Sequence, residues 1–169
     1  MAVRRFPVML GVASGLMAGG FAHADVTVPA ALAVGPEMQL VLSTHAEGAQ
    51  VYACAPDKNE WALKGPDAKL FDEKGAQIGK HYAGPSWELD DGSLLTGEAA
   101  AKDPGPDANA VAWLLLKVKT NSGKGLLAKV SAIQRIETVG GLAPKGACKP
   151  GDEVRSPYTA TYRFFAVKS

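Results

Sequence analysis

Turn-forming residues recur at short, regular intervals along this chain, and their spacing constrains the possible fold more than any other feature. Clusters rich in Gly, Pro, Asp and Asn occupy residues 56–59, 65–67, 72–75, 84–85 and 90–92. Turn signals separated by about eight to twelve residues are typical of sandwiches and barrels built from short strands. No helical periodicity is visible between them. The sequence therefore predicts an all-β fold, an antiparallel β-sandwich or barrel of short strands with at most one or two short helical turns.

The segments between the turns alternate between apolar and polar residues as strands do. Residues 38–45 and 49–55 predict a hairpin with its turn at 46–48, followed by a short strand at Trp61 and Leu63 that ends at Gly65. Residues 72–75 begin with two acidic residues and end with Gly75, a pattern that predicts a second reversal. Gly84-Pro85 and residues 90–92 predict two more.

The second half of the chain contains the most apolar segment outside the N-terminus. Residues 111–118 suit either a central strand covered on both faces or a buried helix, and their short length favours the strand. Residues 158–167 alternate strictly and predict the last strand, with Tyr158, Ala160, Tyr162 and Phe164 on one face. We expect residues 25–37 to form an extended lead-in with one helical turn near 30–33, and residues 98–110 to form a surface loop.

The N-terminal residues 1–24 have the pattern of a secretory signal peptide. Arg4 and Arg5 precede a short apolar run, and Ala22-His23-Ala24 offers a small-x-small cleavage site. A retained transmembrane anchor is the alternative, but the run is shorter than the ~20 apolar residues that a span requires. We therefore expect cleavage near Ala24, a periplasmic or secreted protein without stable membrane insertion, and a single β-rich domain over residues 25–169.

The charge balance of the remaining chain excludes an electrostatic nucleic-acid surface. The sequence has 18 basic and 17 acidic side chains, and removal of Arg4 and Arg5 with the leader leaves 16 and 17, a formal net charge of −1. The lysines and arginines are scattered singly. Proteins that bind nucleic acids concentrate positive charge on one face, so we expect no nucleic-acid partner.

Two cysteines, Cys54 and Cys148, are present, and both lie beyond the leader. In an oxidising compartment an even pair predicts a disulfide, and the alternative is a buried free cysteine with a second exposed one. The two residues are 94 positions apart. Closure of so long a loop gives an upper figure of about 4 to 5 kcal/mol for the stabilisation by such a bridge.

Standard catalytic motifs are absent, so candidate site residues come from one dense segment. No GxSxG, HExxH, GxGxxG or phosphate-loop pattern occurs. Residues 79–93 contain His81, Tyr82, Trp87 and Glu88, of which His81, Trp87 and Glu88 are expected to line one concavity. The alternative is that the aromatic residues only fill the core. Trp61 follows a polar turn and is the tryptophan most expected to be exposed.

Several segments of the chain resemble the domain of unknown function 3455 family, a group of exported proteins from bacteria and fungi. The resemblance rests on residues 48–54, on residues 81–88 with 91–93, on Trp113-Leu114-Leu115-Leu116, and on residues 138–141 leading to Cys148. It extends over about residues 48–165. It implies export and a shared fold, and it supplies no substrate and no catalytic residues.

Together these features predict an exported, non-enzymatic module that binds a small molecule, a glycan or a protein. Its expected binding residues are His81, Tyr82, Trp87, Glu88 and Trp61, without a cofactor or a metal. Two alternatives stay open. The first is a hydrolase or metal-assisted enzyme that uses His81 and Glu88, and the second is a structural or envelope-stress protein without a ligand.

Overall fold

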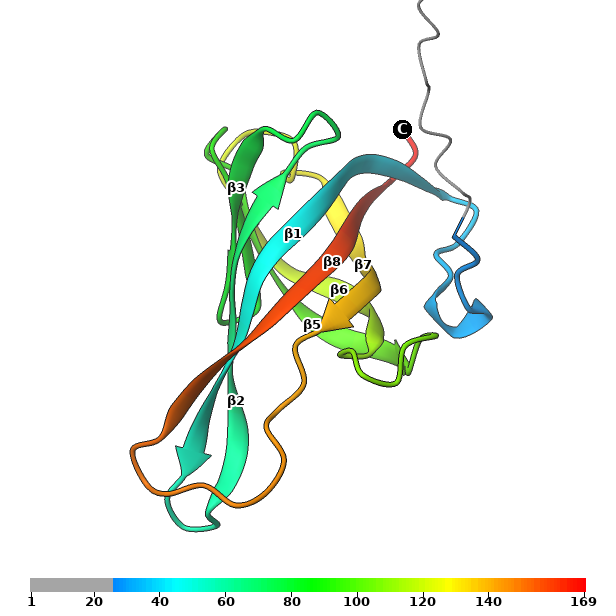
Figure 1. Cartoon of the computed structure of the whole chain (residues 1–169). Helices are drawn as coiled ribbons and strands as arrows, with labels where there is room; N and C mark the ends of the chain where they lie inside the picture. Colours follow the sequence, from blue (N-terminus) through cyan, green and yellow to red (C-terminus); the bar gives the residue numbers. More distant parts are fainter. Residues whose placement is uncertain (1–25) are drawn as a thin grey trace, which may run out of the picture.

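Hydrogen bonding between neighbouring strands continues around a full circle in this protein. The computed structural model describes residues 26–169. Within them each strand pairs antiparallel with the next along the chain, and the first strand pairs with the last, which closes a barrel (Figure 1). The strands are β1 (Met38–Ala55), β2 (Glu60–Phe71), β3 (Gln77–Tyr82), β4 (Ser86–Leu89), β5 (Leu94–Asp103), β6 (Trp113–Ser122), β7 (Val130–Gly140) and β8 (Glu153–Val167).

The predicted all-β antiparallel class is confirmed, and the architecture is the barrel rather than the sandwich. The only helical element among the described residues is the 3-10 turn η1 (Ala30–Leu32), which lies in the predicted lead-in. The reversals predicted at residues 72–75, 84–85 and 90–92 are present between consecutive strands. Asp72 stabilises the first of them by accepting hydrogen bonds from the backbone N–H groups of Lys74 and Ala76, both at 2.9 Å.

The predicted turn at residues 46–48 is wrong, because β1 runs through it without interruption. Gly48 pairs with Ala68 of β2 on one side and with Tyr158 of β8 on the other. A Cβ atom at position 48 would collide with the backbone of Asp67 and Ala68. The glycine therefore permits two strands to approach closely and does not reverse the chain.

Two other predicted breaks are also strand in the structure. Pro66 lies within β2 opposite Gln50, next to a register shift between Val51 and Tyr52, where a proline is tolerated because ladder pairing is already irregular. Residues 98–103 of the predicted surface loop belong to β5, and small alanines there pair with β6 across a second irregularity. The connection from β5 to β6 is confined to residues 104–112.

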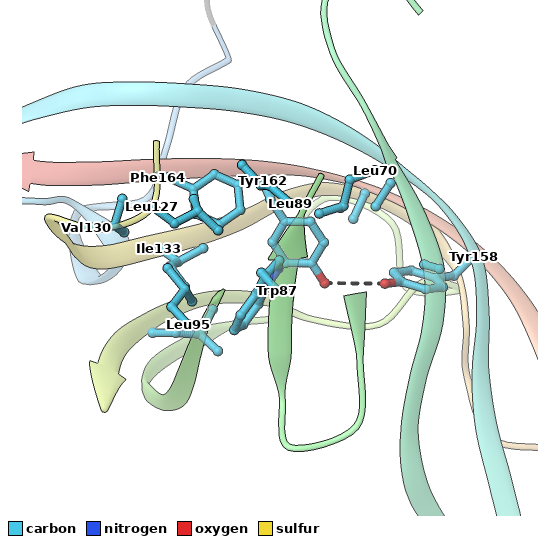
Figure 2. Close-up of a cluster of buried hydrophobic side chains, with 14 residues drawn as sticks. Leu70, Trp87, Leu89, Leu95, Leu127, Val130, Ile133, Tyr158, Tyr162 and Phe164 are labelled. Atoms are coloured by element: carbon cyan, nitrogen blue, oxygen red, sulfur yellow. Dashed lines mark hydrogen bonds between the residues drawn. The ribbon is translucent and has the colours of Figure 1, made fainter. Parts of the chain in front are cut away.

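The barrel interior contains the main hydrophobic core (Figure 2). Tyr158, Ala160, Tyr162 and Phe164, predicted to share one face of the last strand, are all buried in this cluster. Leu127 enters it from the β6–β7 connection and is completely buried. That connection is secured by Asp91, whose carboxylate accepts a hydrogen bond from the N–H of Leu126 at 2.8 Å.

A second apolar cluster lies outside the barrel, under the lead-in. Leu32 of η1 packs with Trp113 of β6 and Ile136 of β7, and all three are buried. The Gln134 side chain fixes the lead-in by donating a hydrogen bond to the carbonyl oxygen of Leu32 at 2.7 Å. Residues 111–118 thus have both faces covered where β6 begins, as their continuous apolar sequence predicts.

The predicted disulfide is confirmed. Cys54 and Cys148 are bonded with a Cα–Cα distance of 5.6 Å, which joins the end of β1 to the β7–β8 connection. Backbone hydrogen bonds from Cys54 N–H to Asp152 and from Cys148 N–H to Asn59 accompany the bond. This part of β1, β2 and β8 extends beyond the shorter strands (Figure 1).

The predicted leader, residues 1–24, lies outside the described residues. In residues 26–169 no helix has the length and apolar character needed to cross a membrane.

Candidate functional site

A cavity of about 400 Å³ occupies part of the barrel interior and is open to solvent, because exposed residues such as Leu63 and Ala99 line it together with buried ones. Every strand contributes to its wall: Gln50 from β1, Pro66 from β2, His81 from β3, Trp87 from β4, Ala99 from β5, Leu114 from β6, Arg135 from β7 and Tyr162 from β8. The β3–β4 turn, Gly84-Pro85, lines it as well. The cavity adjoins the hydrophobic core and shares Trp87 and Tyr162 with it. It is mostly apolar, with a few polar groups that converge on one space.

His81 and Trp87 face this interior as a stacked pair. They are opposite one another in the β3–β4 ladder, and their rings lie 4.3 Å apart between centroids with planes 15° apart. Tyr162 meets the imidazole edge-on at 4.9 Å. The His81 and Trp87 side chains are buried, with 2% and 1% of their surface exposed.

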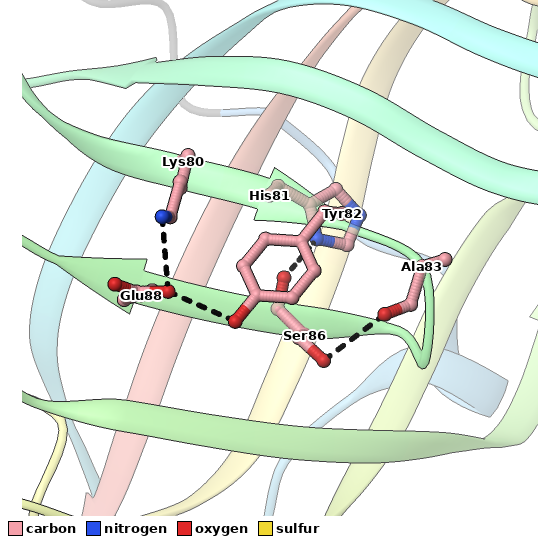
Figure 3. Close-up of polar contacts among 6 residues, drawn as sticks. All are labelled: Lys80, His81, Tyr82, Ala83, Ser86 and Glu88. Atoms are coloured by element: carbon pink, nitrogen blue, oxygen red, sulfur yellow. Dashed lines mark hydrogen bonds and ion pairs between the residues drawn. The ribbon is translucent and has the colours of Figure 1, made fainter.

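The hydrogen bonding and burial of His81 define its protonation state. Its Nδ1 lies 2.8 Å from the carbonyl oxygen of Ser86 (Figure 3). A carbonyl oxygen can only accept, so Nδ1 carries the proton and Nε2 keeps a lone pair. Burial, together with a smaller effect of the positive charge of Arg135, lowers the pKa of His81 to about 3 against the opposing effect of the Ser86 hydrogen bond. The imidazole is therefore neutral over the physiological range.

Tyr82 and Glu88 face the opposite side of the same two strands. The Tyr82 hydroxyl donates to Glu88 Oε2 at 2.9 Å, and Lys80 Nζ lies 3.2 Å from that oxygen (Figure 3). The Tyr82 hydrogen bond and the Lys80 ammonium lower the pKa of Glu88, and the bond to Glu88 raises that of Tyr82. Side chains alternate along a strand, so residues 81 and 87 point inward while 82 and 88 point outward. The predicted concavity of His81, Trp87 and Glu88 does not form.

Trp61 is separate from both groups. It pairs with Cys54 in the β1–β2 ladder, beside the disulfide, and is partly exposed. It does not line the cavity. The five predicted binding residues therefore divide among the interior, the outer face of β3 and β4, and the disulfide end of β2.

Two residues of the cavity were missed by sequence reasoning. Gln50 of β1 is 1% exposed, and its Nε2 has no hydrogen-bond partner among the described residues. Arg135 of β7 is half-buried and donates from Nε and Nη2 to the carbonyl oxygen of Ala112, at 3.1 and 2.7 Å. Alternate residues of a strand point to the same face, so a polar residue two positions from an inward apolar one also points inward. Arg135, two positions after Ile133, has this signal.

The phenols of Tyr52, Tyr158 and Tyr162 are also buried. The hydroxyl groups of Tyr158 and Tyr162 lie 3.4 Å apart, and Tyr52 donates to the carbonyl oxygen of Gly141 at 2.8 Å. Burial raises the pKa of all three phenols, and the charge of Arg135 opposes this effect in each. They are neutral at physiological pH. Within residues 26–169, no three His, Cys, Asp or Glu side chains are grouped so that they could hold a metal ion.

Comparison with known proteins places nearly the whole barrel in one family. Residues 35–166 match the family described as "Protein of unknown function (DUF3455)". The chain belongs to this family. The DUF3455 match begins before β1 and ends within β8, so it includes every cavity residue from Gln50 to Tyr162. A search of curated proteins and a search of solved structures each found no match. The resemblance expected from the sequence is therefore confirmed, and the family description names no ligand and no reaction.

Proposed function

We propose that this protein is an exported, non-enzymatic binding protein that holds one small, largely apolar molecule inside its barrel. The observation that carries the proposal is the cavity of about 400 Å³ to which all eight strands contribute. An eight-stranded barrel is just wide enough either to be filled by its own side chains or to hold one small ligand. Volumes of roughly 300 to 1,000 Å³ are usual for small-molecule sites.

The composition of the wall supports this proposal. Trp87, Leu114 and Leu116 offer apolar surface. Gln50 Nε2 and His81 Nε2 are hydrogen-bonding atoms that are not engaged by another residue in the described part of the chain. Sites for small molecules typically combine a hydrophobic wall with a few placed polar groups. A cavity that was only a packing defect would be expected to have an apolar wall throughout.

The enzymatic alternative that uses His81 and Glu88 lacks its geometry. The two side chains point to opposite faces of the sheet, and Glu88 is paired with Tyr82 and Lys80. A general base works best with a pKa near the operating pH. Burial holds that of His81 at about 3, which makes its imidazole a hydrogen-bonding group rather than an effective base.

Export is part of the proposal. The Cys54–Cys148 bond is stable in the oxidising compartments outside the cytoplasm. It accords with the leader expected from residues 1–24. We place the protein in the periplasm or the extracellular space.

Titration with a neutral, environment-sensitive dye, N-phenyl-1-naphthylamine, tests the binding function. We expect saturable fluorescence enhancement with one dye per protein molecule. Ala99 lines the cavity, whereas its neighbour Ala100 does not. Ala99→Trp should therefore weaken dye binding by about tenfold or more, equal to about 1.4 kcal/mol, and Ala100→Trp should leave it unchanged. Absence of saturable binding, or equal weakening by both substitutions, would show that the barrel interior is not the binding site.

A further inference from the structure

Arg135 places a positive charge in the cavity wall without a negative partner. Among the ion pairs of residues 26–169 none includes Arg135, and no Asp or Glu lines the cavity. The groups whose titration its charge affects are His81, Tyr52, Tyr158 and Tyr162. All four are neutral, and none of them supplies a negative charge to the guanidinium.

A guanidinium in such surroundings favours an anion. Charges removed from water are stabilised when an opposite charge and hydrogen bonds are supplied, and the planar fork of arginine suits a carboxylate. Arg135 uses Nε and Nη2 to hold the carbonyl oxygen of Ala112, and it also hydrogen-bonds the Tyr162 hydroxyl. The five N–H bonds of a guanidinium exceed what these two acceptors require.

Two further donors in the same wall lack acceptors. Gln50 Nε2 and Trp87 Nε1 are buried, and neither has a hydrogen-bond partner in the described part of the chain. A buried donor without an acceptor is costly and rare in native proteins. A carboxylate offers only acceptor sites and matches this surplus of donors.

The wall of the cavity has one cation without a negative partner, Arg135, which matches a ligand with a single negative charge. Lys64 is the other cationic residue of the wall, and its Nζ lies 2.7 Å from Glu153. The rest of the wall is apolar, including Leu114 and Leu116. We propose that the cavity selects an apolar carboxylic acid, whose carboxylate pairs with Arg135 while its hydrocarbon body lies against Trp87 and the two leucines. This inference rests on the proposed binding function and names its ligand class.

Competition of the bound dye by decanoate and by 1-decanol, at neutral pH, tests the selection. The two molecules share one hydrocarbon chain and differ in charge. We expect the protein to bind decanoate at least about tenfold more tightly than decanol, a difference of about 1.4 kcal/mol. Equal binding of decanoate and decanol would overturn the proposal, because Arg135 would then serve only to hold Ala112. Saturable dye binding in the same experiment would still support the proposed binding function.

Substitutions assign the preference to Arg135. Arg135→Gln should bring the ratio of decanoate affinity to decanol affinity, both measured on that same variant, to about one. Arg135→Lys, which keeps the charge, should retain part of the preference and covers the case in which the glutamine variant does not fold. Arg163→Gln is the control that removes the same charge. Arg163 follows Tyr162, the β8 partner of Arg135, and faces the other side of the sheet. This substitution should leave the preference intact. A preference that survives in Arg135→Gln, or is lost in Arg163→Gln, contradicts the assignment.

Discussion

At the residue scale, the position of each side chain on the barrel wall decides its chemistry. His81 and Tyr82 are neighbours in the sequence, yet one is enclosed beside Trp87 and the other lies outside with Glu88 and Lys80. Their pKa shifts have different causes for this reason. Burial dominates at His81, whereas hydrogen bonding and nearby charge dominate at Glu88.

The buried imidazole predicts a loss of stability on mild acidification. In the unfolded chain a histidine binds its proton near pH 6.5, whereas His81 in the folded barrel has a pKa of about 3. Between these values the unfolded state binds more protons, so stability falls as the pH falls. Lowering the pH to about 5 should cost about 2 kcal/mol of unfolding free energy, measured by urea denaturation.

The dependence of stability on pH, rather than the stability at one pH, tests whether His81 causes the loss of stability in acid. Glu88 and Asp91 also have lowered pKa values, but their contribution is lost only below the ordinary carboxyl range. His81→Gln should remove most of the slope between about pH 7 and about pH 5. His45→Gln, which removes an exposed imidazole outside the barrel, is the matched control for the substitution itself. An unchanged slope in His81→Gln would mean that the imidazole is not buried and neutral.

At the element scale, long strands are built from segments that look like turns. Gly48 and Pro66 both read as breaks in the sequence, but each lies within a paired strand. Their small or restricted backbones suit the close approach and irregular register that a strongly curved sheet requires. By contrast, the turn at residues 72–75 does reverse the chain, and the Asp72 side chain stabilises it through hydrogen bonds.

The disulfide belongs to this scale because it fastens one connection to the end of β1. The double substitution Cys54→Ser with Cys148→Ser should lower the unfolding free energy by about 2 to 4 kcal/mol, below the loop-closure maximum, because flanking backbone hydrogen bonds still hold part of the connection. Urea denaturation of the two proteins gives the difference. Wild-type protein under reducing conditions should match the variant. A loss within about 0.5 kcal/mol would show that the bond adds little to the folded barrel.

At the scale of the whole molecule, closure by β1 and β8 makes the strands interdependent. These two strands pair over most of their length, although they are the first and last in the chain. The core draws side chains from every strand, and the lead-in covers the outer face where β6 begins. No strand can leave without opening the ladder on both sides.

This interdependence predicts cooperative unfolding. The near-ultraviolet circular dichroism of the stacked aromatic interior and the far-ultraviolet signal of the strands should give coincident urea transitions. Both are measured on the same samples with the disulfide intact. An aromatic signal that disappears at lower urea concentration than the strand signal would instead indicate a cavity region that opens by itself.

The sequence by itself determined the class of the fold, several of its reversals, the inward face of β8 and the partnership of Cys54 with Cys148. These follow from local spacing, from the period of two along a strand and from having only two cysteines. The proposed binding site did not follow from them. Gln50, His81 and Arg135 lie on three strands far apart in the sequence, and only barrel closure brings them to one cavity. The tertiary structure also separated Glu88 from His81, because each residue's face of the sheet depends on a register set by the neighbouring strands.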